Sequence, residues 1–391
     1  MFNEELKLDK ALRWGMIGGG RGSQIGYIHR ASAARDGLFT LVAGSFDIDF
    51  ERGVAFGKNI GVDESRCYSD YITMFREEAK RKDGIQVVSV ATPNRFHYEM
   101  SKAALEFGLH VVCEKPLTFT VKEAEELKHL ALKNNRVVGV TYGYSGHQML
   151  HQAKNMIQNG EIGDVRIIQM QFAHGWHTSA VEVNDPGTKW RVTPDVAGPT
   201  YVLGDVGTHV YYLAQVMIPD LKIKNLLCTR QSFIPSRAPL EDNAFVLMNF
   251  ENGAVGNLWA SCINAGSMHD LKIRVIGSKA SIEWCDEHPN QLHFQVQGEP
   301  KQILDRGHQY NYNDDPMVNS DRLGGGHAVG LFESWANIYH RFGLIMDKVN
   351  HGADVDKIDL WYPDINAGIE GVRLLERCVE SADKGSTWVD F

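Results

Sequence analysis

The 391-residue sequence has no long apolar run, no excess of positive charge and no cysteine pattern typical of a disulfide-stapled fold. No apolar stretch approaches the roughly 20 residues that a membrane-spanning helix needs, and Met1–Lys7 lacks the basic and apolar segments of a signal peptide. The net charge of −9 argues against general nucleic-acid binding. The six cysteines are scattered without a C-x-x-C pair, which favours reduced thiols. These absences predict a cytoplasmic globular protein without membrane or nucleic-acid partners.

Residues 1–144 alternate between short apolar runs and helix-compatible segments, a pattern that predicts a doubly wound parallel sheet. A strand over Leu12–Ile17 leads into the glycine-rich loop Gly18–Gly26. Such a loop lets backbone turn sharply and approach a pyrophosphate at a helix N-terminus. Ser23 stands where the third glycine is usual, so Gly26 could supply the close helix packing instead. The loop residues expected to contact a dinucleotide are Gly18, Gly20, Arg21, Ser23, Gln24 and Ile25.

The second expected strand, Phe39–Phe46, ends at Asp47. A carboxylate there accepts hydrogen bonds from the adenosine ribose and repels a 2′-phosphate, which favours NAD over NADP. Arg52 lies nearby and leaves NADP open. An alternative is that Asp47 or Asp49 only caps the helix that begins near Phe50. We assign the cap to Asp49 and the ribose to Asp47.

Two further strand ends carry polar residues to the same sheet edge. The expected strand Val87–Ala91 ends in Thr92-Pro93-Asn94, and Asn94 can cap the helix that follows. His97 lies near the start of that helix, where a capping or packing role is as well supported as cofactor binding. The buried run Val111–Cys113 ends in Glu114-Lys115-Pro116. Ligands of open α/β sheets lie beyond the carboxyl ends of strands, so we expect Lys115 where cofactor meets substrate. The alternative is a surface Glu-Lys pair.

From about residue 145 the periodicity changes to the alternation of half-buried strands, as in Ile168–Phe172 and Leu271–Val275. Ala244–Ser261 reads as a hairpin around Asn252-Gly253. We therefore expect residues 145–391 to form an α+β substrate-binding and oligomerisation domain with a large open, mainly antiparallel sheet. The C-terminal helix could pack back on the first domain. An open sheet face needs covering, which predicts a homo-oligomer, a dimer or tetramer, formed through it.

Asp205 and His209 are the strongest chemical pair of this half. Four residues apart, they would share one face of a helix, where the carboxylate orients the imidazole for proton transfer. On the residues alone, a capped helix start with a packed histidine is the favoured interpretation. His174 and His177 could suggest a metal site, but no third ligand has convincing spacing, so no metal is predicted. Trp176, between them, could stack on a sugar ring.

The sequence resembles the glucose–fructose oxidoreductase/inositol dehydrogenase (Gfo/Idh/MocA) family over nearly the whole chain. Four motifs carry the resemblance: the glycine loop, Ala91-Thr92-Pro93-Asn94 with His97, Glu114-Lys115-Pro116, and Asp205-x-Gly-x-His209. The resemblance implies an α/β Rossmann N-terminal domain and identifies Lys115, Asp205 and His209 as catalytic residues that meet at the reacting carbon. It also implies cofactor contacts from Thr92, Pro93, Asn94, His97, Glu114 and Lys115, and a Lys115–Pro116 peptide that is often cis.

The departures from the family pattern fall at pocket positions. Tyr212 stands where many relatives carry Asp, and Gly198-Pro199-Thr200 replaces a glycine triplet. Residues 305–326 are polar and aperiodic; His327 after them could reach the site, or the segment is a surface excursion. Substrate contacts are expected from Tyr144, His174, Trp176, Trp190, Arg191, Tyr212 and His327.

The resulting hypothesis is an NAD-dependent dehydrogenase or reductase acting on a secondary hydroxyl or ketone of a cyclic polyol, sugar or glycoside. One alternative within the superfamily is a glycosidase that uses tightly held NAD as a transient oxidant. Another is a non-catalytic dinucleotide-binding regulator, which the joint presence of Lys115, Asp205 and His209 argues against.

Overall fold

The computed structural model describes residues 8–391, so the prediction about a signal peptide at Met1–Lys7 lies outside the described residues. The chain forms two compact units. The N-terminal unit holds the described residues up to Gly143 and Trp335–Ile369; the C-terminal unit holds Tyr144–Ser334 and Glu370–Phe391. The sequence had assigned all of 145–391 to the second domain, whereas the segment 335–369 lies with the first. Over the described range, no helix has the length and apolar character required to span a bilayer.

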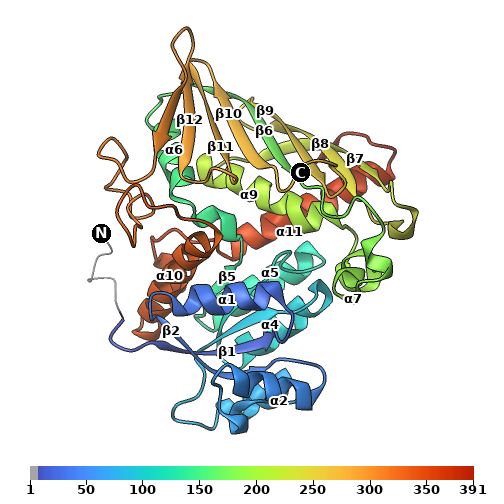
Figure 1. Cartoon of the computed structure of the whole chain (residues 1–391), viewed down its shortest axis with the longest axis vertical. Coiled ribbons are helices and arrows are strands. Elements are labelled where there is room, and N and C mark those ends of the chain that lie inside the picture. The colour runs from blue at the N-terminus through green and yellow to red at the C-terminus, as the bar shows by residue number, and fades with distance from the viewer. Residues whose placement is uncertain (1–7) are drawn as a thin grey trace. The chain divides into compact units, whose positions relative to one another are not determined.

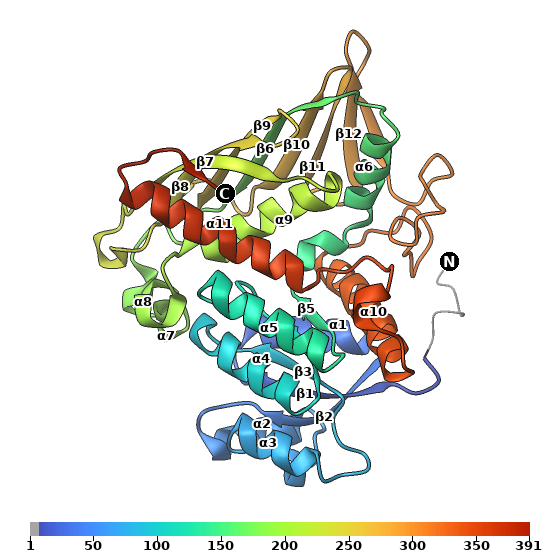
Figure 2. The same ribbon diagram turned by 180° about the vertical axis from the view of Figure 1, so that it is seen from behind.

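The N-terminal unit is built on a five-stranded parallel sheet in the order β2-β1-β3-β4-β5. Its strands are β1 (Leu12–Gly18), β2 (Phe39–Ser45), β3 (Val87–Ala91), β4 (His110–Cys113) and β5 (Val138–Val140). Its helices are α1 (Gln24–Ala34), α2 (Phe50–Asn59), α3 (Tyr71–Glu78), α4 (His97–Glu106) and α5 (Val121–Lys133). Helix α1 covers one sheet face, and α4 and α5 cover the other (Figures 1 and 2). The predicted Rossmann architecture is confirmed.

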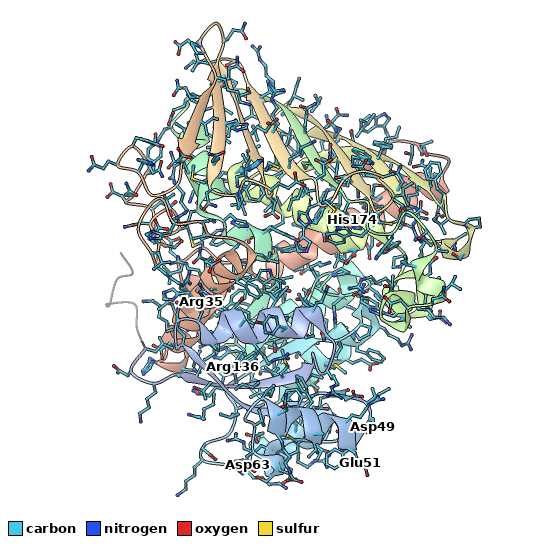
Figure 3. The ribbon with its side chains drawn as sticks, viewed as in Figure 1. Arg35, Asp49, Glu51, Asp63, Arg136 and His174 are labelled. Atoms are coloured by element: carbon cyan, nitrogen blue, oxygen red, sulfur yellow. The ribbon has the colours of Figure 1, made fainter. Side chains whose placement is uncertain are left out.

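Local sequence explains where these helices begin. Asp49 caps α2 through its hydrogen bond from the Arg52 N–H, as predicted. Figure 3 shows Asp49 and Glu51 at this start of α2. Helix α4 differs, because a 3₁₀ turn over Asn94–Phe96 precedes it, and neither Pro93 nor Phe96, at the two N-cap positions, forms a side-chain cap bond. The N-cap position of α4 therefore falls on Phe96 rather than on Asn94 as predicted, because the 3₁₀ turn moves the first α-helical residue to His97.

The C-terminal unit is built on a nine-stranded sheet in the order β13-β12-β11-β10-β6-β9-β8-β7-β14. Neighbours are antiparallel except β6 and β9, so the sheet is mainly antiparallel, as predicted. Its strands are β6 (Val165–Ala173), β7 (Ile223–Gln231), β8 (Asn243–Phe250), β9 (Val255–Ser261), β10 (Leu271–Gly277), β11 (Ala280–Cys285), β12 (Gln291–Val296), β13 (Gln302–Asp305) and β14 (Val389–Asp390). The sequence did not single out β7, β13 or β14.

Helices cover one face of this sheet. They are α6 (Gln148–Gln158), α9 (Thr208–Met217) and the end of α11 (Ile365–Asp383), and Figures 1 and 2 show no helix over the opposite face. The short helices α7 (Pro186–Lys189) and α8 (Pro194–Ala197) precede α9. Helix α10 (Leu331–Asn350) begins in this unit and continues into the other.

The uncovered face carries a patch of exposed apolar side chains on three adjacent strands. Ile167 of β6 pairs with Val255 of β9, and Phe245 of β8 pairs with Trp259 of β9, whose ring it stacks on at 5.7 Å. Leu247 lies two residues along β8 from Phe245 and points to the same face. Ile167, Phe245, Leu247 and Val255 are 40–48% exposed. We call these five residues the outward patch.

Candidate active site

The glycine loop lies where neighbouring strands β1 and β3 continue into loops that diverge, the usual position of a nucleotide in a doubly wound sheet. Three glycines leave no room for a side chain. A Cβ at Gly18 would overlap the Ala91 carbonyl oxygen, one at Gly20 the Phe46 carbonyl oxygen, and one at Gly26 the backbone of Gly19. Gly26 therefore supplies the close helix packing that Ser23 cannot, as the sequence suggested.

The start of α1 is shaped to receive an anion. The Ser23 hydroxyl caps the helix by accepting from the Gly26 N–H at 3.1 Å, and Arg30 donates to the Gly19 carbonyl oxygen at 2.6 Å. Arg21 and Gln24 are exposed, and a Cβ at Gly22 would meet nothing within 4 Å. Backbone N–H groups at a helix N-terminus bind phosphate. The loop thus fits the pyrophosphate of a dinucleotide.

Asp47 stands at the end of β2 as an ionised carboxylate. Its Oδ1 accepts from Arg52 Nη2 at 2.9 Å and from the Asp49 N–H at 3.0 Å. The hydrogen bond from Arg52 is the main cause that lowers the pKa of Asp47, and the Asp49 N–H adds to it. Because Arg52 is paired with this carboxylate, the arrangement favours ribose hydroxyls over a 2′-phosphate.

The ends of β3 and β4 are joined by a buried histidine. The ring nitrogens of His97 lie 2.9 Å from the Thr92 carbonyl oxygen and 2.8 Å from that of Pro116. Of the alternatives left open for His97, the contacts describe a packing histidine that ties Thr92-Pro93-Asn94 to the Lys115–Pro116 segment. The Lys115–Pro116 peptide is cis, as predicted.

Glu114 points into the unit's interior. Its Oε1 lies 3.0 Å from His29 Nε2 and accepts from the Thr141 hydroxyl at 2.6 Å. Burial raises the pKa of Glu114, but His29, Lys115 and Thr141 outweigh burial and lower it. The Tyr339 hydroxyl holds the other ring nitrogen of His29. The carboxylate is therefore engaged by protein groups, while Lys115 is only partly buried at the sheet edge.

Asp205 and His209 lie on a continuous helical segment, as expected. A π-helical turn over Leu203–Gly207 carries Asp205 and runs directly into α9, which carries His209. Asp205 Oδ2 lies 3.8 Å from Arg191 Nε, and the Arg191 guanidinium lies 4.7 Å from the centre of the Trp190 ring. Predicted site residues Trp190 and Arg191 are thus brought to Asp205.

The His209 ring is part of a group of aromatic and imidazole side chains that we call the ring cluster: Tyr144, Phe172, His174, Trp176, His209 and His269. Tyr144 lies edge-on to His209 at 5.0 Å, and Phe172 lies 6.3 Å from it. Phe172 also contacts His174, which stacks on Trp176 at 4.1 Å (His174 is labelled in Figure 3). The cluster brings together the predicted residues Tyr144, His174 and Trp176 with His209.

The charge state of His174 follows from its position in the cluster. Burial lowers the pKa of His174 to about 4, so the ring is neutral at neutral pH. Its Nδ1 accepts from the Trp176 N–H at 3.3 Å, which places the ring proton on Nε2. His174 therefore offers a neutral N–H donor, a group suited to a hydroxyl oxygen.

Sequence reasoning missed His269 and Asp286. They lie at the open ends of the paired strands β10 and β11, whose register sets Lys272 against Cys285. Asp286 lies 3.1 Å from His269 Nε2 and 3.2 Å from His147 Nε2. The sequence did contain an indication of this pair, because a hairpin that turns at Gly277-Ser278-Lys279 brings residues 269 and 286 to the same end of its two strands.

Three residues that the sequence suggested as substrate contacts or metal ligands are not part of the ring cluster. Tyr212 is buried in α9, one turn beyond His209. His177 bonds the Tyr201 hydroxyl, and among residues 8–391 no cluster of three or more His, Cys, Asp or Glu side chains is placed to hold a metal ion. His327 is exposed and bonds the Gly324 carbonyl oxygen.

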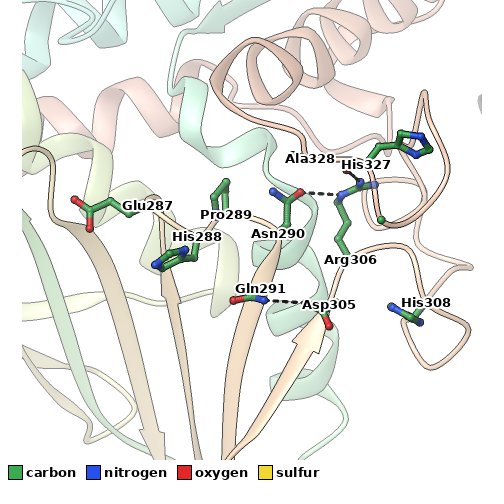
Figure 4. Close-up of a pocket in the computed structure, with 11 residues that line it drawn as sticks. Glu287, His288, Pro289, Asn290, Gln291, Asp305, Arg306, His308, His327 and Ala328 are labelled. Carbon is green, nitrogen blue, oxygen red and sulfur yellow. Dashed lines mark hydrogen bonds between the residues drawn. The ribbon is translucent and has the colours of Figure 1, made fainter.

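His327 lines a pocket of about 430 Å³ between the loops that follow β11 and β13 (Figure 4). Asn290 and Arg306 face each other there, with Arg306 Nε donating to Asn290 Oδ1 at 3.0 Å. None of the ring-cluster residues lines this pocket. The structure therefore does not bring His327 into the ring cluster.

A buried carboxyl, Glu241, holds the start of the helical segment that carries Asp205. It accepts from the N–H groups of Tyr201 at 2.9 Å and Leu203 at 3.0 Å, and lies 3.5 Å from Arg230. Burial raises the pKa of Glu241 to about 7, although these contacts lower it. The stabilisation by the protonated form is complete below the ordinary pKa of 4.5 and is lost as pH rises through about 7.

We expect Glu241→Gln to remove this pH dependence, because the amide oxygen still accepts both N–H bonds and does not titrate. Between pH 5 and 8 the wild type should lose up to about 3 kcal/mol of stability that the variant keeps. Melting temperatures measured across this range test it. Parallel melting profiles for the two proteins would refute the assignment.

Comparison with known proteins agrees with this architecture. A family model described as "Oxidoreductase family, NAD-binding Rossmann fold" matches residues 12–142, and one described as "Oxidoreductase family, C-terminal alpha/beta domain" matches residues 154–391. An uncharacterized oxidoreductase of Bacillus subtilis is 57% identical over the full length of both chains.

Two crystal structures of an inositol dehydrogenase homolog from Azotobacter vinelandii are also similar. The complex with NAD⁺ is 59% identical, with a TM-score of 0.97 and full coverage of both chains. The complex with NADH and myo-inositol is 58% identical, with a TM-score of 0.94 and 98% of each chain covered.

Proposed function

Because the chain belongs to the Gfo/Idh/MocA family and is an NAD-binding oxidoreductase acting on CH–OH groups, we propose that it interconverts a secondary hydroxyl and a ketone on a cyclic polyol, sugar or glycoside. The observation that carries the substrate class is the 58% identity to the homolog whose crystal structure contains NADH and myo-inositol. The ring cluster supports it, because Trp176 offers a half-exposed aromatic face and His174 a neutral donor.

The roles of the chain's own residues follow from their chemistry. His209, with Asp205 as its carboxylate partner, accepts the proton of the substrate hydroxyl. The Lys115 ammonium donates a hydrogen bond to the same oxygen and stabilises its developing negative charge. The nicotinamide of NAD, when bound, supplies the hydride acceptor. Gly18, Gly20 and the α1 N-terminus hold the pyrophosphate, and Asp47 the ribose.

Turnover measurements test the proposal. Reduced-nicotinamide absorbance is followed with NAD and NADP across inositols, aldoses and simple glycosides. We expect NAD reduction with at least one cyclic polyol or sugar. Net glycoside hydrolysis with retained NAD and no accumulating NADH would replace the proposal with the redox-assisted glycosidase. NAD binding without any turnover would favour the regulator.

The outward patch is the surface through which we propose that copies of the chain associate. Its exposed apolar side chains lie side by side on β6, β9 and β8, and a face of this kind is stabilised by burial against another sheet. We expect Phe245→Glu with Leu247→Glu to lower the molar mass in solution to that of one chain, measured by light scattering. Leu132→Glu, on the exposed surface of α5, is the control and should leave the mass unchanged. A wild type that is already monomeric would contradict the proposal.

A further inference from the structure

Asp286 lies between two imidazoles and holds one of them in the ring cluster. Its two oxygens lie 3.2 Å from His147 Nε2 and 3.1 Å from His269 Nε2. Burial raises the pKa of Asp286, but its contacts with His147 and His269 lower it well below the usual range. The group is therefore an ionised carboxylate that lies within ion-pair distance of both rings.

This contact settles which nitrogen of His269 is available to a ligand. Nε2 faces Asp286, which leaves Nδ1 as the ring nitrogen that can form a hydrogen bond with a bound molecule. Among the described residues no protein group bonds Nδ1. His147, on the other side of the carboxylate, packs on Trp284 at 5.2 Å inside the unit. The arrangement thus fixes His269 in position and leaves Nδ1 as its hydrogen-bonding atom for a ligand.

His269 shares its aromatic neighbours with His209. Its ring lies 5.6 Å from Tyr144 and 4.7 Å from Phe172, both of which also contact His209. It lies 5.5 Å from Trp176 as well. A six-membered ring that presents one hydroxyl to His209 therefore has other hydroxyls within the neighbourhood of His269.

Resting on the proposed function, we propose that His269 is a specificity-determining residue: its Nδ1 forms a hydrogen bond with a substrate hydroxyl that is not the one oxidised, and Asp286 positions it. His174 and His269 then both contact the substrate beside Trp176. A hydroxyl can both donate and accept a hydrogen bond and so satisfies Nδ1, whereas a hydrogen at that carbon does not. The enzyme should therefore select substrates by a hydroxyl remote from the reacting carbon.

The test uses enzyme loaded with NADH and measures the affinity for myo-inositol and for its monodeoxy analogues by calorimetry. In the wild type we expect one analogue to bind roughly 10-fold more weakly than myo-inositol. In His269→Leu this analogue should bind as tightly as myo-inositol, while the other analogues keep their affinities relative to myo-inositol. His269→Gln, whose amide can both donate and accept a hydrogen bond, should restore part of the wild-type penalty. His288→Leu, an exposed histidine of the neighbouring loop, is the matched control and should keep the wild-type pattern.

The outcomes separate this inference from the proposed function. If the wild type binds myo-inositol and His269→Leu keeps every penalty, the role of His269 is refuted and the proposed function stands. If His269→Leu weakens NADH binding or melts at much lower temperature together with the lost selectivity, the residue is structural and the inference fails. If the wild type binds neither myo-inositol nor its analogues, the inference is refuted, and the turnover measurements across inositols, aldoses and glycosides decide the proposed function separately.

Discussion

Replacing Lys115 with methionine is expected to lower kcat by at least about 1,000-fold while leaving the affinity for NAD within a few-fold of the wild type. Methionine keeps the length of the side chain but removes the ammonium that we assign to the substrate oxygen. Lys115 lies two residues beyond the end of β4 and precedes a cis peptide bond beside the buried His97, so the backbone around it is held independently of the side chain. Steady-state kinetics and a direct NAD titration measure the two effects.

Lys122→Met is the matched control, because this lysine lies exposed on α5, seven residues along the chain. It should retain wild-type kcat. The double variant Lys115→Met with His209→Ala should be little worse than either single variant, since residues that act on one oxygen contribute non-additively. A Lys115→Met protein with a tenth or more of the wild-type kcat would show that the ammonium is not catalytic.

Gly26→Ala should abolish NAD binding at ordinary concentrations, an affinity loss of at least about 100-fold. The new Cβ would overlap the carbonyl oxygen and Cα of Gly19, and both are backbone atoms that cannot turn aside. Gly19 itself has a φ of +64° and carries the carbonyl that Arg30 holds, so the loop has little freedom to yield. Fluorescence titration with NADH measures the loss.

Gly53→Ala is the control for a glycine-to-alanine change in a helix of the same unit. Its Cβ would make only ordinary contact with Asp47, 3.4 Å from the backbone nitrogen, and alanine favours the helix. NADH affinity should stay close to that of the wild type. If Gly26→Ala binds NADH as Gly53→Ala does, the close approach of α1 to the loop is not needed for the cofactor.

Much of the cofactor half was predictable because its signals are local. Strand, glycine loop and helix follow one another within about 25 residues, and the Asp49 cap acts over three residues. The cis Lys115–Pro116 peptide followed from the family resemblance rather than from chain chemistry. The N-cap position expected at Asn94 falls on Phe96 instead, because the backbone forms a 3₁₀ turn there, which residue preference alone does not distinguish from a helix start.

The substrate half was less predictable because its contacts join distant residues. Strand β7 carries little alternation, yet it pairs along its whole length with β8, and β14 pairs with β7 from the far end of the chain. Glu241 reads as an ordinary charged residue, but its hydrogen bonds to Tyr201 and Leu203 span about 40 residues. Burial of this kind depends on the assembled sheet.

The sequence by itself determined the two kinds of sheet, the glycine loop, Asp47 at the end of β2, and the triad of Lys115, Asp205 and His209 as candidates, since each rests on neighbours in the chain or on a family motif. Only the tertiary structure decided that Glu114 turns inward to His29, that His97 is a packing residue, and that Asp286 holds His269 in the ring cluster. The physical reason is that a side chain's partner, and with it its charge and free hydrogen-bonding atom, is set by which distant strands and helices pack against it.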